Sequence, residues 1–522
     1  MRQVRFFSLL LVLLLLVSGI AGAQDESVLV IGHAESTDSL DPHRGYTQTT
    51  SVILRATYQT LVTFPDDSAA EILPMLATEW TISEDGTQYT FTLNPDAVFA
   101  DGDPVTAEDV VFSVQRLNNV AGSPSFLYAA ASIADVAANE DGTVTFTLSA
   151  PNPAFLAYLS NDHFSIVDSE AVIAEGGSAD GEDTAESFLN NTSVGSGPYV
   201  LEAWDPQVET VLVANENYWG EAPYFSRVVI QNIPEAAAQK AALESGEIDL
   251  ALDLTSDQIS TLEGNADIGI FRGAGNIVHF ILMNGNAEQC GPSADPLVQQ
   301  AVRLALDYEG YTALWGGITP ASPMAYGLFT AYGPDHAVVR DVAAAQALLA
   351  EAGYADGLDI TLEYPTFTFQ GVNMDTNAQK IQSDLAEAGI NVTLSPGDLQ
   401  VSLEGYRTGQ QCFGYWFWGP DVLDPIDTLS FAPGGKVATE RALWTEEDAG
   451  EAYVELVAQA RVETDPAERT VIFEQLQDWL QSNSPWAPFI QPGVQTAYRA
   501  DLTGYVWHPQ WLVDIALLGH AE

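Results

Sequence analysis

The stretch from Cys412 to Pro425, with the sequence CFGYWFWGPDVLDP, places the tightest limits on how this chain can fold. Its first half is rich in aromatic side chains, which favours a buried β-strand. Gly419 and Pro420 end that strand, because proline has no N–H for the ladder and glycine releases the backbone. Asp421 is therefore expected just beyond a strand end and beside Trp418, where aromatic walls of low dielectric strengthen the attraction between a carboxylate and a cation.

This stretch also has a purely structural interpretation. An aspartate after a strand commonly forms an Asx turn, and tryptophan-rich strands commonly belong to a core. Residue chemistry alone leaves open whether Asp421 binds a cation. It equally leaves open whether Trp416 and Trp418 offer their faces to a ligand.

Local patterns along the rest of the chain predict a mixed α/β fold. The helical patterns at 343–351 and 376–387 each end at a glycine and lead into a short apolar strand, as helix–strand units of a sheet do. Asp-Gly pairs at 85–86 and 141–142 indicate hairpin turns between strands. Residues 445–461 are expected to form one amphipathic helix.

The charge of the chain excludes some partners. Among 522 residues, 72 are acidic and 17 are basic, which gives a formal net charge of −55. Such a chain repels nucleic acid and anionic lipid surfaces. The acidity fits a surface adapted to high salt, where screening shortens self-repulsion, or a site for cationic substrates. The length allows roughly two to four domains.

The N-terminus predicts export. Arg2 and Arg5 precede an apolar run over 6–20, and small residues follow at 21–23. This is the pattern of a secretory signal spanning residues 1–23, cut before Gln24. The run is shorter than the ~20 residues of a membrane span. No cysteine lies near the cut, so a lipoprotein anchor is not expected, and the protein is expected to be soluble and periplasmic.

Cys290 and Cys412 are the only two cysteines of the chain. In an oxidising compartment they are candidates for one disulfide. Closing a loop of about 120 residues would stabilise the fold by about 4–5 kcal/mol through chain entropy. Two buried free thiols are the alternative.

Several ordered blocks of the sequence resemble those of one known family. The blocks are LDP at 40–42, YQTLV at 58–62, DGDPVTAEDV at 101–110, VGSGPY at 194–199, YWG at 218–220, ALESGEID at 242–249 and WGPDVLDP at 418–425. Together they resemble the extracytoplasmic solute-binding proteins of family 5, the oligopeptide and dipeptide receptors of ABC importers. The resemblance extends over nearly the whole mature chain.

The resemblance implies an α/β fold of the type II periplasmic-binding-protein kind, with two α/β lobes and a ligand cleft between them. Lobe I is expected to comprise residues 24–272 and 488–522, with an extra subdomain over about 52–191. Lobe II is expected to comprise residues 273–487. The implied partners are a peptide ligand and the ABC permease and ATPase at the inner membrane, with the binding protein itself a monomer.

The resemblance also implies a site. In peptide-binding members, the aspartate that matches Asp421 pairs with the α-ammonium of the peptide, and the tryptophan that matches Trp418 lies against the ligand. Trp416 adds a second aromatic face, and the loop after the first strand is expected to bring Ser36 and Thr37 to the cleft. No arginine or lysine is assignable to a peptide carboxylate.

Other functions follow less directly from the sequence. The aromatic run would also suit a sugar, and some family members bind cello-oligosaccharides or nickel complexes. No zinc-protease, phosphate-loop, nucleophile-elbow or Cys-x-x-Cys motif occurs, and the histidines lack metal-ligand spacing. The sequence therefore predicts a binding protein without catalytic residues, cofactor, bound metal or nucleic-acid partner.

Overall fold

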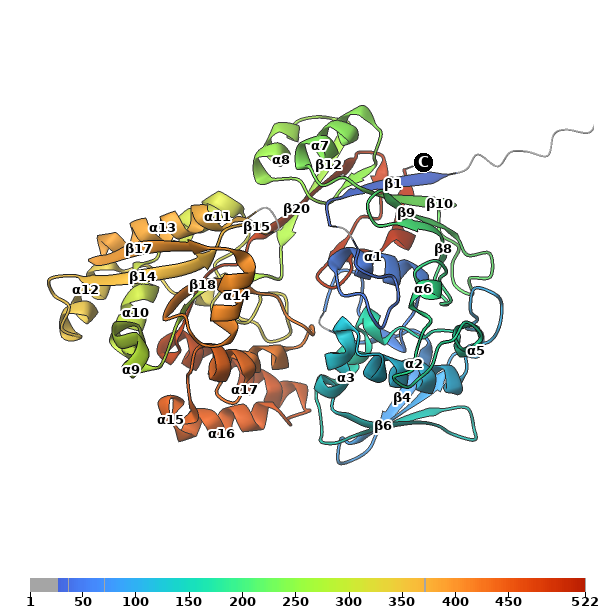
Figure 1. Cartoon of the computed structure of the whole chain (residues 1–522), viewed down its shortest axis with the longest axis horizontal. Helices are drawn as coiled ribbons and strands as arrows, with labels where there is room; N and C mark the ends of the chain where they lie inside the picture. The colour runs from blue at the N-terminus through green and yellow to red at the C-terminus, as the bar shows by residue number, and fades with distance from the viewer. Residues whose placement is uncertain (1–26, 36, 70, 370–371, 522) are drawn as a thin grey trace, which may run out of the picture.

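The structure of the protein is a computed structural model, which describes residues 27–35, 37–69, 71–369 and 372–521. The expected export signal, residues 1–23, lies outside the described residues. The described chain forms two lobes that lie side by side, one around a seven-stranded sheet and one around a five-stranded sheet (Figure 1). Within those ranges, no helix combines the length and apolarity needed to cross a membrane.

The first lobe is organised around a mixed sheet in the order β12-β20-β11-β1-β10-β9-β8. Its central strand β1 pairs in parallel with both β10 and β11, and Leu29 and Ile31 on β1 are fully buried. The strands are β1 Val28–His33, β8 Tyr199–Asp205, β9 Glu209–Ala214, β10 Arg227–Asn232, β11 Leu250–Ala251, β12 Ile268–Ala274 and β20 Gly493–Arg499. The main helices beside them are α1 Gln48–Thr57, α7 Ala236–Ser245 and α8 Ser256–Leu262.

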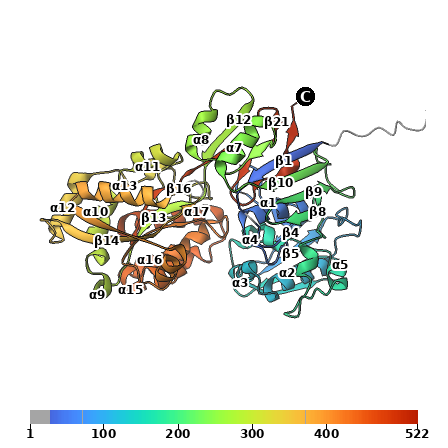
Figure 2. The same ribbon diagram turned by 45° about the horizontal axis from the view of Figure 1, so that its top comes forward.

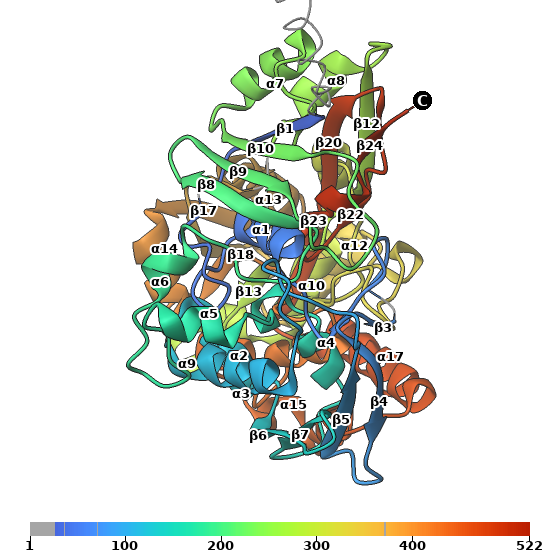
Figure 3. The same ribbon diagram turned by 90° about the vertical axis from the view of Figure 1, so that its right-hand side faces the viewer.

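A smaller antiparallel sheet in the order β4-β5-β7-β6 forms a subdomain of the first lobe, below the larger sheet in Figure 3. Its strands are β4 Ala77–Ile82, β5 Gln88–Leu93, β6 Ile133–Ala138 and β7 Val144–Leu148. The two expected hairpin turns are confirmed, with Gly86 and Gly142 at positive φ. The covering helix α2, Ala107–Asn119, begins at a capping box between Thr106 and Asp109.

The second lobe is organised around a sheet in the order β17-β14-β18-β13-β19. Its strands are β13 Val278–Met283, β14 Leu358–Pro365, β17 Ile390–Gly397, β18 Phe413–Trp418 and β19 Trp486–Ile490. Its main helices are α10 Pro296–Ala305, α11 Tyr308–Trp315, α12 Val342–Glu351, α13 Met374–Glu387, α14 Leu399–Arg407, α16 Glu451–Ala460 and α17 Pro466–Asn483. The two expected helix–strand units are confirmed as α12–β14 and α13–β17. Figure 2 shows the same separation of the two lobes from a tilted direction.

One predicted helix is divided in the structure. The pattern at 445–461 gives α15, Glu446–Ala449, and α16, with Gly450 between them. Gly450 has a φ of 84°, a conformation that glycine adopts without steric penalty and that ends an α-helix. The apolar pattern continues across this residue, since the buried side chains of α15 and α16 belong to one cluster.

The central strands of the second lobe are covered on both faces. On β18, Phe413 and Tyr415 belong to a buried cluster with residues of α10, α12 and α13. Trp416 lies on the opposite face, stacked on Tyr406 of α14, in a cluster that also contains residues of α16 and α17. Strand β13 alternates in the same way, with Ile281 on one face and Phe280 on the other. Burial on both faces explains why these strands are continuously apolar and fixes their register.

The chain crosses between the lobes twice in this part of the fold, from β12 to β13 and from β19 to β20. Gln491 ties the two crossings together, since its side-chain Nε2 donates to the carbonyl oxygen of Gly275. The Gln491 backbone also pairs with Ile318 in a short antiparallel bridge. The crossings are therefore held at a defined spacing.

A disulfide joins Cys290, at the end of α9 (Ala287–Cys290), to Cys412, just before β18. The bridge fixes the start of the strand that leads to Asp421. It closes a loop whose ends are 122 residues apart in sequence.

Removing this bridge is expected to lower the free energy of unfolding by about 4–5 kcal/mol, because the unfolded chain regains the entropy of a long open loop. The measurement is urea unfolding of the double variant Cys290→Ala/Cys412→Ala beside the unchanged protein. Reduction of the unchanged protein with dithiothreitol is the matched control and should lower the midpoint similarly. An unchanged midpoint in both samples would contradict this expectation.

Candidate ligand-binding site

Asp421 lies in a cavity of about 270 Å³ that both lobes line. Strand β18 ends at Trp418, and the Gly419-Pro420 turn carries the chain to Asp421 at the cavity wall. The first lobe contributes its own wall, which includes Tyr46 and Gln48. The buried strand thus presents a carboxylate to a space that is open to a ligand.

The next two aspartates in the sequence, Asp424 and Asp427, have hydrogen-bond donors within the second lobe. Asp424 receives two hydrogen bonds from the guanidinium of Arg469, at 3.0 and 2.5 Å. Asp427 accepts from the indole Nε1 of Trp418 at 2.7 Å and from the backbone N–H of Asp421 at 3.1 Å. Both carboxylates therefore have structural roles in holding the turn.

The Asp421 carboxylate has no such partner among the described residues. The hydroxyl of Tyr46 lies 3.5 Å from its Oδ1, which is a long hydrogen bond across the two lobes. Burial raises the pKa of Asp421, although Tyr46, Arg441 and Lys436 act in the opposite direction. Burial and the charge of Asp421 likewise raise the pKa of Asp427. A ligand cation placed here would stabilise the ionised forms of Asp421 and Asp427, which burial disfavours.

The two candidate tryptophans support the turn instead of lining the cavity. Trp416 is only 3% exposed, stacks on Tyr406 at 4.3 Å between ring centroids, and donates to Gln411 at 2.6 Å. Its expected free aromatic face is thus part of the core. Trp418 is half-buried, and its hydrogen bond to Asp427 fixes the turn from behind.

The loop after β1 does not bring its predicted residues to this cavity. Ser36 lies outside the described residues. Thr37 is buried, accepts a hydrogen bond from the indole of Trp204 at 2.7 Å, and lines a separate cavity of about 20 Å³. The same loop instead brings Tyr46 to Asp421, which the sequence reasoning missed. The only available signal was its position after the Leu-Asp-Pro block.

A second cavity, of about 340 Å³, continues the first toward the chain crossings. The two cavities share Gln48, Asn276 and Ile277 in their linings, so they form one elongated space, which we call the cleft. The second part is lined mostly by uncharged residues, among them Trp315, Trp507, Tyr505 and Gln495. Among the residues that the structure describes, no cluster of three acidic, histidine or cysteine side chains is placed to hold a metal.

A sequence model of the bacterial extracellular solute-binding proteins, family 5 (middle part), matches residues 71–438. The matched region is well over half of the chain. The chain belongs to this family.

Named relatives of this solute-binding protein match it almost end to end. The probable D,D-dipeptide-binding periplasmic protein DdpA of Escherichia coli K12 is 28% identical over 93% of each chain. Di/tripeptide-binding protein 2 of Pseudomonas aeruginosa UCBPP-PA14 is 27% identical over 97% of each chain. The fold resembles that of the periplasmic binding protein DppA from Helicobacter pylori, solved with the peptide STSA, with a TM-score of 0.73, 24% identity and coverage of 95% and 99%. The predicted two-lobe, type II fold is confirmed.

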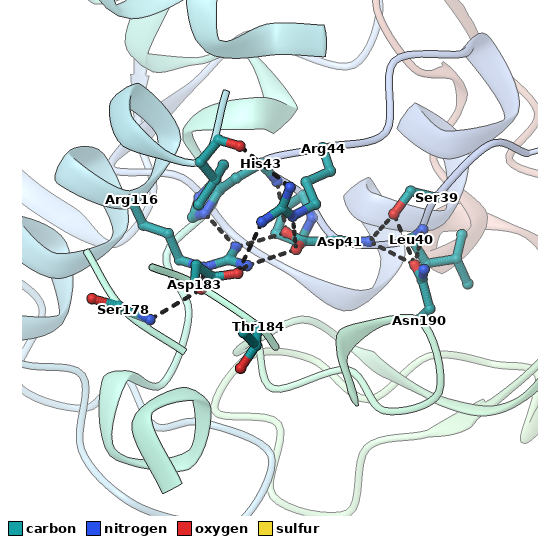
Figure 4. Close-up of polar contacts among 12 residues, drawn as sticks. Ser39, Leu40, Asp41, His43, Arg44, Arg116, Ser178, Asp183, Thr184 and Asn190 are labelled. Carbon is teal, nitrogen blue, oxygen red and sulfur yellow. Dashed lines mark hydrogen bonds and ion pairs between the residues drawn. The ribbon is translucent and has the colours of Figure 1, made fainter. Parts of the chain in front are cut away.

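A buried ion network holds the loop that carries Tyr46 in this family 5 protein (Figure 4). The guanidinium of Arg116, on α2, is fully buried and binds both oxygens of Asp41, at 2.7 and 2.6 Å. It also binds Asp183 at 2.8 and 3.0 Å, and Asp183 accepts from Arg44 at 3.1 Å. The loop is thereby clamped to the subdomain just before Tyr46.

Uncharged contacts complete this clamp. The side-chain oxygen of Asn190 accepts from the hydroxyl of Ser39 and the backbone N–H of Leu40. Burial lowers the pKa of His43 to about 3, so the ring stays neutral beside Arg116. The ring of Tyr46 then packs against His163, with centroids 4.9 Å apart. The position of the Tyr46 hydroxyl is therefore set by the subdomain.

Replacing Arg116 by Met is expected to lower the free energy of unfolding by about 3–5 kcal/mol, because Asp41 and Asp183 lose the cation that compensates their burial. Urea unfolding followed by circular dichroism measures this. The matched control is Arg272→Met, since the Arg272–Glu263 pair is about half exposed and such pairs contribute about 0–1 kcal/mol. Equal, small effects of the two substitutions would contradict a stabilising role for the network.

Proposed function

We propose that this protein is the substrate-binding component of an ABC importer, which binds di- or oligopeptides in the cleft and delivers them to a membrane permease and its ATPase. One observation carries the proposal. The Asp421 carboxylate is partly desolvated, forms no ion pair with a described residue, and lies in a cavity lined by both lobes. A peptide α-ammonium is a small cation that can donate to it.

The geometry suits an ammonium at this position. The carboxylate lies at a turn whose backbone is fixed by Asp427, so its position is pre-organised before a ligand arrives. Hydrogen bonds between an ammonium and a carboxylate are charge-assisted and stronger than neutral ones. The hydroxyl of Tyr46 sits within 3.5 Å of the same oxygen and can move with its lobe.

Contacts from both lobes to one ligand would favour a closed arrangement of the protein. A ligand shifts such an equilibrium only by binding the closed state more tightly. The two crossings fall slightly later than the expected boundaries at 272 and 488, because β12 of the first lobe ends at Ala274 and β19 of the second lobe ends at Ile490. The division proposed here is therefore lobe I, about 24–274 with 491–522, and lobe II, about 275–490, with the subdomain at about 52–191. The closed form of a monomer would then dock on the permease.

The names of the relatives support the peptide assignment. DdpA carries a dipeptide-binding name, and the Pseudomonas aeruginosa relative a di/tripeptide-binding name. Both match this chain over nearly their whole length. We further propose that the protein is exported by the signal at residues 1–23 to the periplasm, without a lipid anchor, and that its cleft binds without catalysing a reaction.

A second candidate function has a specific observation in its favour. The inner part of the cleft is lined by Trp315, Trp507 and Tyr505, and aromatic faces suit sugar rings. An oligosaccharide or a nickel complex would then occupy the cleft on the same fold. Such a ligand would depend on these aromatic residues and little on Asp421.

A thermal-shift screen separates these ligands. The purified protein is mixed with di- and tripeptides, β-glucan oligosaccharides or nickel chelates, each at about 100 times its dissociation constant, where binding adds about 2.7 kcal/mol to stability. We expect a rise in melting temperature with peptides. A rise with sugars or chelates alone would overturn the peptide assignment.

Asp421→Asn is expected to weaken peptide binding at least 30-fold, since losing one partner of a buried charged pair removes about 2–5 kcal/mol. Isothermal titration calorimetry measures the dissociation constants. Asp96→Asn removes an equal charge from an exposed site in the subdomain and should leave binding unchanged. Peptide binding that survives Asp421→Asn, with the fold intact, would contradict an ammonium anchor at this residue.

Peptide affinity is expected to rise as pH increases from about 5 to 7. Because burial raises the pKa of Asp421 and Asp427, the pair holds a proton in this range that an incoming ammonium must displace. One linked proton changes affinity by at most about tenfold per pH unit. Above pH ~8 the gain should end, because the peptide α-amino group then loses its own charge.

The same titration of the free protein has the opposite sign. A carboxyl whose folded-state pKa is raised stabilises the fold below its unfolded pKa and loses that contribution as pH rises through the folded value.

Asp427→Asn removes the coupled carboxyl and is expected to flatten the pH dependence of binding. Affinity that is constant between pH 5 and 7 in the unchanged protein would contradict the linkage.

A further inference from the structure

The charged residues that line the cleft are all of one sign. Among the described residues, the linings contain the carboxylates Glu35, Asp421 and Asp253, and no lysine or arginine. The internal positions outside the description, Ser36, Ala70, Gln370 and Gly371, carry no cationic side chain either. The cleft therefore offers an ammonium a carboxylate but offers an anion no cation.

Several cations lie outside the linings of the cleft. Lys436, whose charge together with that of Arg441 opposes the rise that burial causes in the pKa of Asp421, belongs to neither lining. Three others contact groups outside the cleft. Arg55 binds Asp514 at 2.8 Å. Lys380, over the ring of Tyr311, binds Asp307 at 2.7 Å and Asp384 at 3.1 Å. Arg441 is buried against the rings of Tyr406 and Trp418, with its Cζ 4.7 and 5.4 Å from their centroids. None of these three belongs to the cavity linings.

Asp253, the one acidic side chain in the described lining of the second cavity, is held in place. Asp253 accepts from the ring of His33 at 2.5 Å and from the backbone N–H of Ala34 at 2.8 Å. Burial alone would raise the pKa of Asp253, but the charge of His33 keeps this pKa below its usual value. Asp253 therefore stays ionised and about a third exposed beside the cavity.

The uncharged lining of the inner cavity suits a neutral group. Gln48, Asn276 and Gln495 supply amides, and the rings of Trp315 and Tyr505 supply apolar faces. A carboxylate transferred into such a space loses its hydration without gaining a cation.

We infer that this cleft recognises its ligand by an ammonium at one end and does not recognise a terminal carboxylate at the other. The substrate class is amine-bearing ligands whose far end is uncharged or cationic. Among short peptides, these are C-terminally amidated and basic peptides, with acidic peptides binding most weakly. This inference rests on the proposed function, since it assigns the far end of the ligand that Asp421 holds.

Titration calorimetry with matched peptides tests the inference. Di- and tripeptides of alanine, and the same peptides ending in lysine or glutamate, are each compared as free acid, as C-terminal amide and as N-acetyl derivative. We expect amidation to leave the dissociation constant within threefold or to lower it, and N-acetylation to abolish binding. Peptides that end in lysine should bind at least tenfold more tightly than those that end in glutamate.

Different outcomes would overturn the charge preference and the proposed peptide-receptor function. A tenfold or greater loss on amidation, with binding still lost on N-acetylation, would overturn the inference and leave the peptide receptor standing. The absence of binding by every peptide, free or amidated, would overturn the proposed function together with the inference. Equal binding of the lysine and glutamate series would overturn the charge preference.

A gain-of-function variant tests the inner cavity directly. Gln495 lies on β20 and lines the cavity, and its Nε2 donates to the hydroxyl of Ser256 at 2.7 Å. Gln495→Lys places a cation there and is expected to make free-acid peptides bind at least tenfold more tightly than their amides. Gln88→Lys adds the same charge at an exposed position of the subdomain sheet and should leave the ratio unchanged. An unchanged ratio in Gln495→Lys would overturn the placement of the far end in this cavity.

Discussion

The burial of β18 on both faces is the constraint on which the cleft depends. Packing from α13 on one side and α17 on the other leaves the strand a single register and a fixed end. Gly419-Pro420 then turns the chain out of the sheet, so the first side chain free to face the other lobe is that of Asp421. The core fixes the position of this carboxylate, which forms no ion pair with a described residue and can accept a cation from the ligand.

Part of this arrangement follows from the sequence because it is local. Helix ends, hairpin turns and the Gly-Pro stop are set by a few neighbouring residues, and the structure contains them at 85–86, 141–142 and 419–420. The alternation of side chains along a strand also predicts which residues share a face, as Trp416 and Trp418 do on β18. Residues 416 and 418 share a face, so packing Trp416 against Tyr406 also turns Trp418 toward the core.

The rest of the site depends on contacts between distant parts of the chain. Tyr46 and Asp421 are 375 residues apart, and the Arg469 that binds Asp424 lies on another helix. The sequence pattern at 445–461 could not reveal the break at Gly450, because glycine also occurs inside helical patterns. Thr37 occupies a place in the expected loop, yet its hydrogen bond to Trp204 turns it away from the cleft.

The scarcity of cations links the stability of this protein to its selectivity. With 17 basic residues against 72 acidic ones, a buried arginine such as Arg116 is used where two carboxylates meet, and the desolvation of Asp41 and Asp183 would otherwise oppose folding. The same scarcity leaves the linings of the cleft, as far as they are described, without a positive side chain.

The ligand therefore has to supply the missing charge, and it must do so at the point where the lobes meet. Gln48, Asn276 and Ile277 belong to both cavities, next to the crossings that Gln491 ties together. A ligand long enough to reach from Asp421 past these residues touches both lobes, so its binding energy favours a closed arrangement. Discrimination by charge then rests on Asp421, while the uncharged walls around the crossings set how much of the ligand can be enclosed.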